Sequence, residues 1–267
     1  MPVQSKLLRL KRILSEYGSC LVAFSGGVDS SFLLKACSLV IPEEKLLAVT
    51  AVSATYPEGE IFKARDLAKK IGVRLEVIRT SELEIAGFAG NSAQRCYFCK
   101  KELFSRMLKT AKEKGLKFVL DAGNFSDKGD YRPGEKAKKE LGIKSPLCDA
   151  GITKEEVRAF SKLLGLPNWD KPSSACLASR IAYGIKITPS VLKRVGRAES
   201  YLASLGLRQV RLRHHGSLCR IETDILGIPR LMRNRAKIVD KFKKLGYNYV
   251  TLDLEGYRTG SLNEVIK

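Results

Sequence analysis

The hydrophobic pattern of the first 120 residues alternates between short apolar runs and longer amphipathic stretches. Apolar or alternating runs at 21–24, 46–52, 74–79 and 117–120 predict strands. Helical spacing at 30–40, 58–71 and 103–114 places helices between these strands. Such alternation predicts an α/β fold with a doubly wound, mostly parallel sheet, which binds its ligands beyond the carboxyl ends of its strands.

The pattern changes after a segment that contains Pro167, Pro172 and Pro189. A helix at 190–205, a hairpin at 208–214 and 217–222, a helix at 229–245 and a strand at 247–254 follow. We therefore predict a domain boundary near residue 187. Residues 1–187 would form the larger domain, and 188–267 a small α+β domain with an antiparallel sheet for substrate binding and oligomerisation.

A glycine-rich turn joins the first predicted strand to the following helix. Its residues are Ser25, Gly26, Gly27, Val28, Asp29, Ser30 and Ser31. The glycines permit positive φ angles, so backbone N–H groups can point at phosphate oxygens, and the helix N-terminus adds its dipole. The turn lacks the lysine of a Walker motif. Asp29 stands where that positive charge would be, which favours pyrophosphate held together with Mg²⁺.

The string SGGVDSS resembles the PP-loop of N-type ATP pyrophosphatases, a superfamily that includes NAD and GMP synthetases, argininosuccinate synthetase and tRNA thiolases. The resemblance implies that ATP adenylates a substrate and that pyrophosphate is released. It also implies that Ser53, at the end of the second predicted strand, lies where such proteins hold the adenine ring.

The seven cysteines fall into two classes by their surroundings. Four lie in or beside apolar stretches or predicted strands and are expected to be small core residues, namely Cys20, Cys37, Cys148 and Cys219. Cys96 and Cys99 form a C-x-x-C pair that can grip one metal ion or cluster from a loop, and Cys176 can join them from another loop. Three thiolates on a [4Fe–4S] cluster would leave one iron open to carry sulfide.

Other interpretations of these cysteines stay open on the residues alone. A structural zinc site needs a fourth ligand, and the chain has only two histidines, His214 and His215. A redox-active Cys96–Cys99 disulfide and a Cys176 that donates its own sulfur are the further alternatives.

Charged residues follow two other predicted strands. The segment after residue 120 contains Asp121, Asn124 and Arg132, which suit Mg²⁺ or phosphate, or form an ordinary surface loop. In the hairpin, Arg211 and Arg213 share one strand face and Arg220 lies on the next strand, as a phosphate site or as a solvated face. Glu199 and Glu222 could orient these arginines.

The net charge of +20 is large for 267 residues. It is typical of a protein that binds polyanions or of one with a lysine-rich solvated surface, and both interpretations stay open. No apolar run approaches about 18 residues, so we expect no membrane partner. Residues 1–12 are basic and amphipathic, which favours a first helix over a signal peptide and predicts a cytoplasmic protein.

Six segments carry a more specific resemblance. They are SGGVDSSFLL, RCYFCK, DAGNFSDKGDYRPG, NWDKPSSACLASRIAYG, AESYLASLGLRQVRLRHH and VTLDLEGYRTGSLN. Together they resemble the LarE family along nearly the whole chain. This family comprises ATP-dependent sulfur transferases that make the nickel-pincer nucleotide cofactor of lactate racemase.

The resemblance implies a pyridinium dicarboxylate mononucleotide as substrate, whose carboxylate is adenylated and then converted to a thiocarboxylate. It implies that Cys176 lies at or next to the sulfur-delivering position. Arg211 and Arg213 would hold the substrate phosphate, with Glu199 nearby. The family is commonly hexameric, so a homo-oligomer is expected, whereas the sulfur donor is unknown.

Some family members sacrifice a cysteine sulfur, and others resemble this chain in using a cluster held by three cysteines. In the sacrificial members the region matching Cys96 and Cys99 lacks both cysteines, and the reactive cysteine falls one place earlier, where this chain has Ala175. This departure favours a [4Fe–4S] cluster on Cys96, Cys99 and Cys176.

The main alternative is a tRNA thiolase, which shares the activation chemistry and would explain the basic charge. The predicted second domain is small for extensive tRNA contact, so no nucleic-acid partner is expected. An amide synthetase of the GMP or NAD kind would need an ammonia source, and the sequence contains no glutaminase segment. A nucleotide-binding regulator would bind ATP without releasing pyrophosphate.

Overall fold

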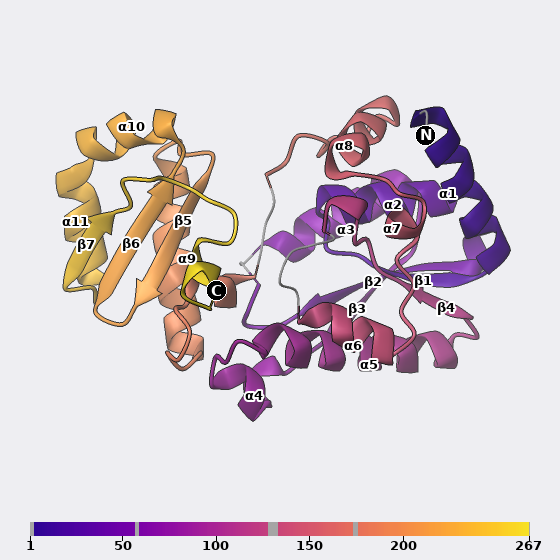
Figure 1. The fold of residues 1–267 in the computed structure, drawn as a ribbon, viewed down its shortest axis with the longest axis horizontal. Helices are drawn as coiled ribbons and strands as arrows, with labels where there is room; N and C mark the ends of the chain where they lie inside the picture. Colours follow the sequence, from indigo (N-terminus) through magenta and orange to yellow (C-terminus); the bar gives the residue numbers. More distant parts are fainter. Residues whose placement is uncertain (1–2, 57–58, 128–132, 173–175, 267) are drawn as a thin grey trace. The chain divides into compact units, whose positions relative to one another are not determined.

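The computed structural model describes residues 3–56, 59–127, 133–172 and 176–266 (Figure 1). The chain packs as two compact units that interleave in sequence. The first contains Met1–Ser53, Gly59–Glu82 and Cys96–Ser173, and the second contains Ala54–Glu58, Leu83–Arg95 and Ser174–Lys267. These units describe packing, and the single domain boundary near residue 187 stays a prediction.

The first unit is built on a four-stranded parallel sheet. Its strands are β1 (Cys20–Ala23), β2 (Leu46–Val52), β3 (Leu75–Arg79) and β4 (Phe118–Leu120), in the order β3-β2-β1-β4. Val22 at the centre of β1 pairs with Ala48 on one side and with Leu120 on the other. The strand order reverses beside β1, and such a switch point is where open parallel sheets bind their ligands.

Helices cover both faces of this sheet (Figure 1). The unit's helices are α1 (Val3–Tyr17), α2 (Val28–Ser38), η1 (Glu43–Lys45), α3 (Glu60–Ile71), α5 (Arg95–Glu113), η3 (Phe125–Asp127), α6 (Gly134–Glu140), α7 (Pro146–Asp149) and α8 (Lys154–Leu163). The predicted α/β fold with a mostly parallel sheet is therefore confirmed.

The strand side chains alternate between two apolar cores. On one face Val22 and Ala48 pack with Phe32 of α2 and Phe160 of α8. On the other face the neighbouring strand positions pack with α5, whose Phe104 is fully buried. Burying one such large side chain stabilises the fold by about 1.5–3 kcal/mol. Because both faces are covered, β1 and β2 read as continuous apolar runs, whereas the edge strand β3 alternates.

The second unit contains a three-stranded sheet with helices on one face. Its elements are η2 (Glu82–Glu84, shared with the first unit), α4 (Ala86–Ala89), η4 (Leu177–Arg180), α9 (Pro189–Ser204), β5 (Val210–His215), β6 (Leu218–Thr223), η5 (Ile225–Gly227), α10 (Ile228–Arg233), α11 (Arg235–Lys244), β7 (Tyr249–Leu252) and η6 (Ser261–Ile266). Leu202 of α9, together with Ile238 and Phe242 of α11, is buried in this unit.

Three details of the sequence prediction are wrong. The small sheet is mixed, because β5 and β6 form an antiparallel hairpin but β7 pairs parallel to β6 after a helical crossover. The helix expected at 229–245 is split into α10 and α11 at Asn234. The helix expected to begin near Leu103 begins at Arg95, since no glycine or proline interrupts residues 95–113.

Among the described residues, no helix is both long enough and apolar enough to cross a bilayer.

Candidate functional site

The PP-loop adopts a conformation that depends on glycine. Gly26 has a φ of +69°, in the left-handed region that other residues rarely occupy. A side chain there would also meet Ala64 of α3, whose Cα and Cβ lie 3.4 Å from the position of the added Cβ. Gly27 is the N-cap residue of α2, so no side chain caps the N-terminus of this helix. The loop is thus shaped by its backbone, with the first N–H groups of α2 at the carboxyl end of β1.

Three serine hydroxyl groups surround this loop. The Ser31 hydroxyl donates to the Gly27 carbonyl oxygen at 2.8 Å, and the Ser30 hydroxyl reaches the same oxygen at 3.1 Å. The Ser25 hydroxyl lies 3.1 Å from that of Ser30 and accepts a hydrogen bond from the Gly27 N–H. Ser30 and Ser31 are buried and fix the turn, whereas Ser25 is exposed. Ser25 is therefore the hydroxyl best placed to meet a ligand.

Asn168, from the segment after α8, also holds the loop. Its side-chain amide donates to the Gly26 carbonyl oxygen at 3.2 Å and to the Ser31 hydroxyl at 3.0 Å. Its amide oxygen is buried and makes no hydrogen bond within the described part of the chain. The PP-loop is thus clamped by a residue about 140 positions away in sequence.

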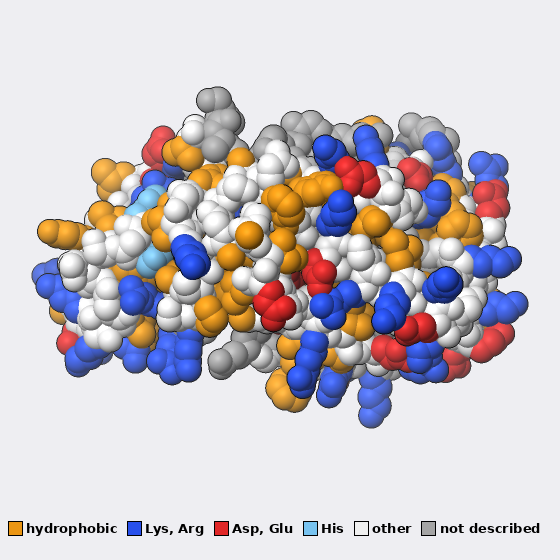
Figure 2. Space-filling view, turned by 90° about the horizontal axis from the view of Figure 1, so that it is seen from below, with side chains coloured by type: hydrophobic (Ala, Val, Ile, Leu, Met, Phe, Trp, Pro, Cys, Tyr) orange, Lys and Arg blue, Asp and Glu red, His pale blue; other side chains and the backbone are white. Residues whose placement is uncertain are grey.

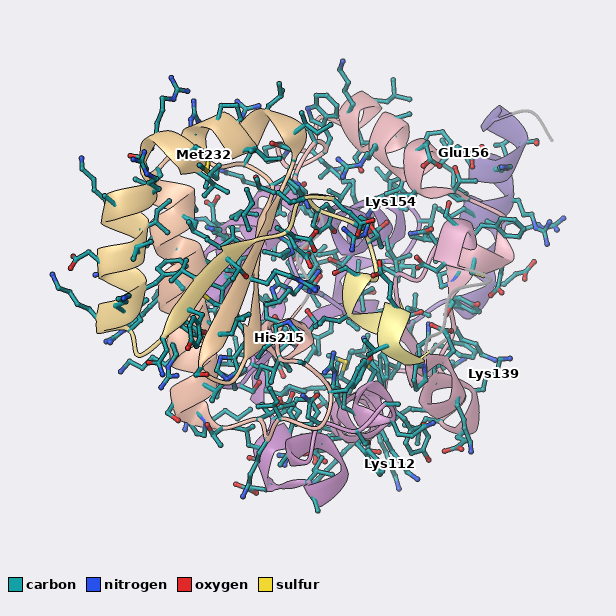
Figure 3. The ribbon with its side chains drawn as sticks, turned by 60° about the vertical axis from the view of Figure 1, so that its left-hand side comes forward. Lys112, Lys139, Lys154, Glu156, His215 and Met232 are labelled. Atoms are coloured by element: carbon teal, nitrogen blue, oxygen red, sulfur yellow. The ribbon has the colours of Figure 1, made fainter. Side chains whose placement is uncertain are left out.

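A lysine from another helix approaches the PP-loop. The ammonium group of Lys154, the first residue of α8, forms an ion pair with Asp29 Oδ2 (Lys154 is labelled in Figure 3). The amide of Asn124, which follows β4, donates to Asp29 Oδ1 at 3.1 Å. Lys154 and Asp29 are each about three-quarters buried. The positive charge that the loop lacks in sequence is therefore supplied by α8.

The carboxyl end of β4 is anchored by a buried ion pair. Lys138 of α6 lies 3.0 Å from Asp121 Oδ1 and 2.7 Å from Glu135, and Asp121 also accepts a hydrogen bond from Ser145. Burial lowers the pKa of Lys138, but the carboxylates of Asp121 and Glu135 raise it by more, so the net change is a rise. Asp121 thus fixes the loop that presents Asn124. Arg132, predicted to bind phosphate from the same loop, lies outside the described residues.

The second unit contains a buried arginine–glutamate network. The register pairs Arg213 with Arg220 and Arg211 with Glu222, so all four side chains lie on one face of the hairpin. The shared face was predicted for the three arginines. Arg213 donates to Glu222 at 2.7 Å, to Ser261 at 2.9 Å and to the Ser179 carbonyl oxygen at 3.0 Å. Its buried Nε–H has no hydrogen-bond partner among the described residues.

The same network reaches Cys176. Glu199 of α9 accepts two hydrogen bonds from Arg180, at 2.9 and 3.2 Å, and one from the Leu212 N–H. Arg180 in turn donates to the Cys176 carbonyl oxygen at 3.3 Å, and the Ser179 hydroxyl donates to it at 2.8 Å. The structure thus joins Cys176 to the arginine cluster within one unit.

Arg211 lies in a strongly positive environment. Burial, and next the nearby Arg180, lower the pKa of its guanidinium group, and Glu199 opposes this only in part. The Arg211 guanidinium also lies 5.4 Å from the centre of the Tyr257 ring. A lowered pKa means that these surroundings disfavour the charged form of Arg211. An anionic ligand beside the guanidinium group would favour the charged form.

The cysteines are divided between the units. Cys96 and Cys99 lie in the first turns of α5 rather than in a loop, exposed and half-buried respectively. Their i, i+3 spacing puts both thiols on one helix face, which suits two ligands of one cluster. Cys176 is half-buried and belongs to the second unit. No group of three metal-ligating side chains occurs within the described residues of the chain.

The cysteines expected in the core behave largely as predicted. Cys20, Cys37 and Cys219 are fully buried, and burial raises the pKa of the Cys219 thiol to about 12. Cys148 on α7 is half-buried.

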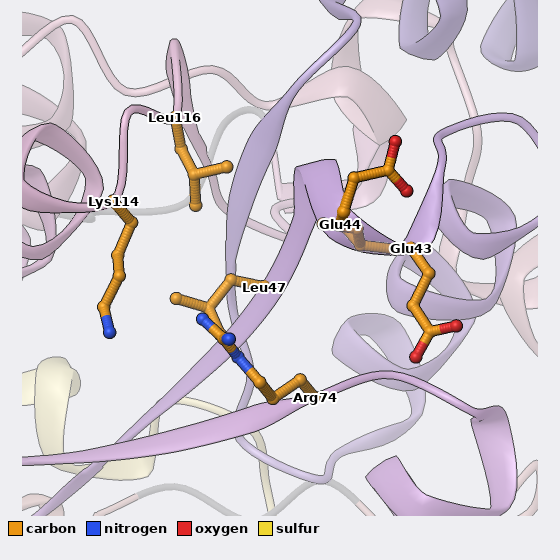
Figure 4. Close-up of a pocket in the computed structure, with 7 residues that line it drawn as sticks. Glu43, Glu44, Leu47, Arg74, Lys114 and Leu116 are labelled. Atoms are coloured by element: carbon orange, nitrogen blue, oxygen red, sulfur yellow. The ribbon is translucent and has the colours of Figure 1, made fainter.

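A cavity of about 470 Å³ lies elsewhere on the first unit (Figure 4). It is lined by Glu43, Glu44, Leu46, Leu47, Arg74, Lys114 and Leu116. Leu46 begins β2, and Arg74 and Leu116 precede β3 and β4, so the cavity opens at the amino ends of the strands. The PP-loop lies at their carboxyl ends, and this cavity is therefore no part of the predicted nucleotide site.

Comparison with known proteins decides the family. Residues 3–181 match the NAD synthase family, whose PP-loop this chain shares. Over 98% of its length the chain is 36% identical to the pyridinium-3,5-bisthiocarboxylic acid mononucleotide synthase of Lactiplantibacillus plantarum, of which 95% is covered. The chain belongs to the LarE family.

Two other relatives match this LarE-family chain along nearly all of its length. An uncharacterised protein of Synechocystis is 43% identical over 99% of both chains. An uncharacterised protein of Methanocaldococcus jannaschii is 29% identical over 95% of this chain and 98% of its own. Both matches include the two units, so the second unit is part of the shared protein.

Sequence reasoning missed three residues of the LarE-family protein that now stand out. Lys154, Asn168 and Arg180 each contact a predicted site residue, but none lies in a motif whose spacing indicates that contact. Arg180 had the clearest signal, because it follows Cys176 by four residues within the segment that carries the resemblance. The roles predicted for Ser53, which directly follows β2, and for the PP-loop serines remain predictions.

The buried network of the second unit yields a stability prediction. Glu222 is completely buried between Arg213 and Arg220. Replacing it with glutamine is expected to lower the free energy of unfolding by about 3–5 kcal/mol, because two guanidinium groups lose their buried counter-charge. Urea denaturation measures the loss, and hydrogen exchange should localise it to β5 and β6.

The matched control is Glu255→Gln, whose side chain is 74% exposed and pairs with Arg258. An exposed pair contributes about 0–1 kcal/mol, so this variant should unfold almost as the parent does. Equal losses in the two variants would contradict the role of the buried network.

Proposed function

We propose that this LarE-family protein is an ATP-dependent sulfur insertase of the cytoplasm. It adenylates a carboxylate of a pyridinium dicarboxylate mononucleotide and converts that carboxylate to a thiocarboxylate during nickel-pincer nucleotide synthesis. The product named for the Lactiplantibacillus plantarum relative is of this kind. The observation that carries the proposal is the hydrogen-bonded connection between Cys176 and the arginine cluster.

The activation step uses the first unit. The loop amides and Ser25 would hold the β- and γ-phosphates of ATP, Lys154 would add positive charge, and Asp29 would hold Mg²⁺. A carboxylate oxygen of the substrate attacks the α-phosphorus as the bond to the bridging oxygen breaks. The products are an acyl-adenylate and pyrophosphate, which carries away the electron pair of the broken bond. The loop thus stabilises the leaving group.

The sulfur step follows at the acyl carbon. A sulfur nucleophile attacks this carbon, and AMP leaves with the electron pair of the C–O bond, so that a thiocarboxylate remains. Arg211 and Arg213 would hold the substrate phosphate during this exchange. Glu199 would orient the arginine cluster through its hydrogen bonds with Arg180. When bound by three thiolates, a [4Fe–4S] cluster supplies an open iron site for sulfide. Cys96, Cys99 and Cys176 would be its ligands.

A reconstituted assay tests the proposal directly. The protein is purified without oxygen and incubated with ATP, Mg²⁺, sulfide and the pyridinium substrate. We expect pyrophosphate release to depend on that substrate, and mass spectrometry to show one oxygen exchanged for sulfur over many turnovers. Pyrophosphate release that needs tRNA instead would replace this proposal with a tRNA thiolase, and ATP binding without release would indicate a regulator.

Cysteine variants separate the cluster from its alternatives. Cys96→Ser, Cys99→Ser and Cys176→Ser should each lose protein-bound iron and turnover, whereas Cys148→Ser, at a half-buried position on α7, should keep both. A protein without iron that turns over many times would contradict the cluster. A single turnover that leaves Cys176 without its sulfur would establish sacrifice instead.

A further inference from the structure

The outer surface of the second unit's helices carries a concentrated positive charge. Over residues 229–245 the chain has seven lysines and arginines but one acidic residue, Asp240. All seven basic side chains are exposed, and Arg230 donates to the Gly206 carbonyl oxygen. The other six define the basic helical face on α10 and α11, namely Arg233, Arg235, Lys237, Lys241, Lys243 and Lys244. In Figure 3 many side chains of these two helices project away from the small sheet and end in nitrogen.

A neighbouring helix extends this basic helical face. Lys241 lies 5.8 Å from the centre of the Tyr201 ring of α9, so α9 and α11 are side by side. Lys193 and Arg197, also on α9, are both exposed. The acidic Glu199 of α9 is engaged instead with Arg180. Two adjacent helices therefore present cations with little intervening negative charge.

Helix stability explains only part of this pattern. Lys241, Lys243 and Lys244 occupy the last turn of α11, where cations favour the helix dipole. Arg235 and Lys237 lie in the first turn, where cations oppose the dipole and where no acidic residue is present. Positive charge is thus kept at both ends of α11, at some cost to the helix. A requirement other than folding accounts for the first-turn cations.

The nucleotide-binding unit has a different surface. On the face shown in Figure 2, its lysine and arginine side chains, to the right, alternate with acidic ones. Many of them form local ion pairs, such as Lys70 with Asp66 and Arg106 with Glu102. Such interspersed charge is typical of a solvated surface. The basic helical face is therefore a local feature and not a sample of a uniformly lysine-rich surface.

The chemistry of the basic helical face restricts its partner. Interfaces with proteins have an apolar core depleted of lysine, but the exposed large apolar side chains of α10 and α11 are Met232 and Val239. A membrane-surface helix inserts its apolar side, whereas here Leu231, Ile238 and Phe242 are buried inside the unit. A phosphodiester backbone needs only a row of cations.

We propose that the basic helical face binds the phosphodiester backbone of a nucleic acid. Helix α11 has ten residues and is therefore about 15 Å long. Because a duplex carries about one negative charge per 1.7 Å of its axis, the helix spans several phosphates. This proposal departs from the expectation from sequence that no nucleic acid is a partner. That expectation considered the size of the second domain and not its charge distribution.

Fluorescence anisotropy of the full chain tests this inference. The probes are labelled RNA and DNA of about 20 residues, single-stranded and duplex, titrated between about 0.05 and 0.2 M salt. The test variant is Arg235→Gln/Lys237→Gln/Lys241→Gln. Two of its changes remove cations that oppose the helix dipole, so lost binding cannot be ascribed to a weakened helix start. We expect the affinity of this variant for the probes to fall at least about 10-fold. The slope of log K against log salt concentration should decrease in magnitude by about two to three.

The control is Lys69→Gln/Lys109→Gln/Lys112→Gln, which removes the same charge from exposed positions on α3 and α5. It should bind nearly as the parent does, and both variants should retain pyrophosphate release. Equal weakening in both variants would show only the effect of net charge and would overturn the inference. Absence of binding at about 0.1 M salt, or binding to anionic lipid vesicles but to no nucleic acid, would overturn it as well.

Discussion

Replacing Lys154 with methionine is expected to slow ATP-dependent pyrophosphate release by about 10³-fold, the effect of removing one preorganised charge from a developing anion. Lys154 and Mg²⁺ are both cations, so they repel each other where one Asp29 oxygen would hold both. We therefore expect the arrival of ATP and Mg²⁺ to exchange these partners. The ammonium group would turn to the phosphates, and the carboxylate to the metal ion.

Conservative and matched variants make this prediction specific. Lys154→Arg keeps the charge and should retain more activity than methionine does. Lys162→Met makes the same chemical change in the last turn of the same helix, at an exposed position, and should leave the rate unchanged. The measurement is pyrophosphate release under saturating ATP. An undiminished rate in Lys154→Met would show that the lysine serves only to hold Asp29 before ATP binds.

The central fold was predictable from sequence because its signals are local. The strands buried on both faces appear as uninterrupted apolar runs, and the glycine of the PP-loop stands where a positive φ is required. The start of α5 was missed because the cysteine motif was interpreted as a loop. The direction of β7 could not be read from its residues, since an edge strand pairs parallel or antiparallel according to its connection.

The site was predictable only where its residues lie close together in sequence. Arg211, Arg213 and Arg220 share a hairpin, so strand alternation was enough to predict one face for them. Lys154 reaches Asp29 across 125 positions, and the fold alone creates that contact. Arg180 was visible in the sequence, but nothing local indicated that Glu199 would hold it.

The second large effect is expected at Arg211. Replacing it with alanine should lower kcat/KM for the pyridinium substrate by about 10²-fold, through a higher KM, while kcat changes little. A phosphate distant from the reacting carboxylate is held equally before and during the reaction, so its loss affects binding. Arg211 shares one face of the hairpin with Arg213 and Arg220, where a phosphate can meet several guanidinium groups.

The KM for ATP distinguishes this role from a structural one. It should be unchanged in Arg211→Ala, since the PP-loop belongs to the other unit. Arg211→Lys should recover part of the loss, because it keeps the charge but not the two-pronged donor. Arg208→Ala, at an exposed position three residues earlier, should behave as the parent does. A lower kcat with an unchanged substrate KM in Arg211→Ala would move the phosphate site to Arg213, whose buried Nε–H still requires an acceptor.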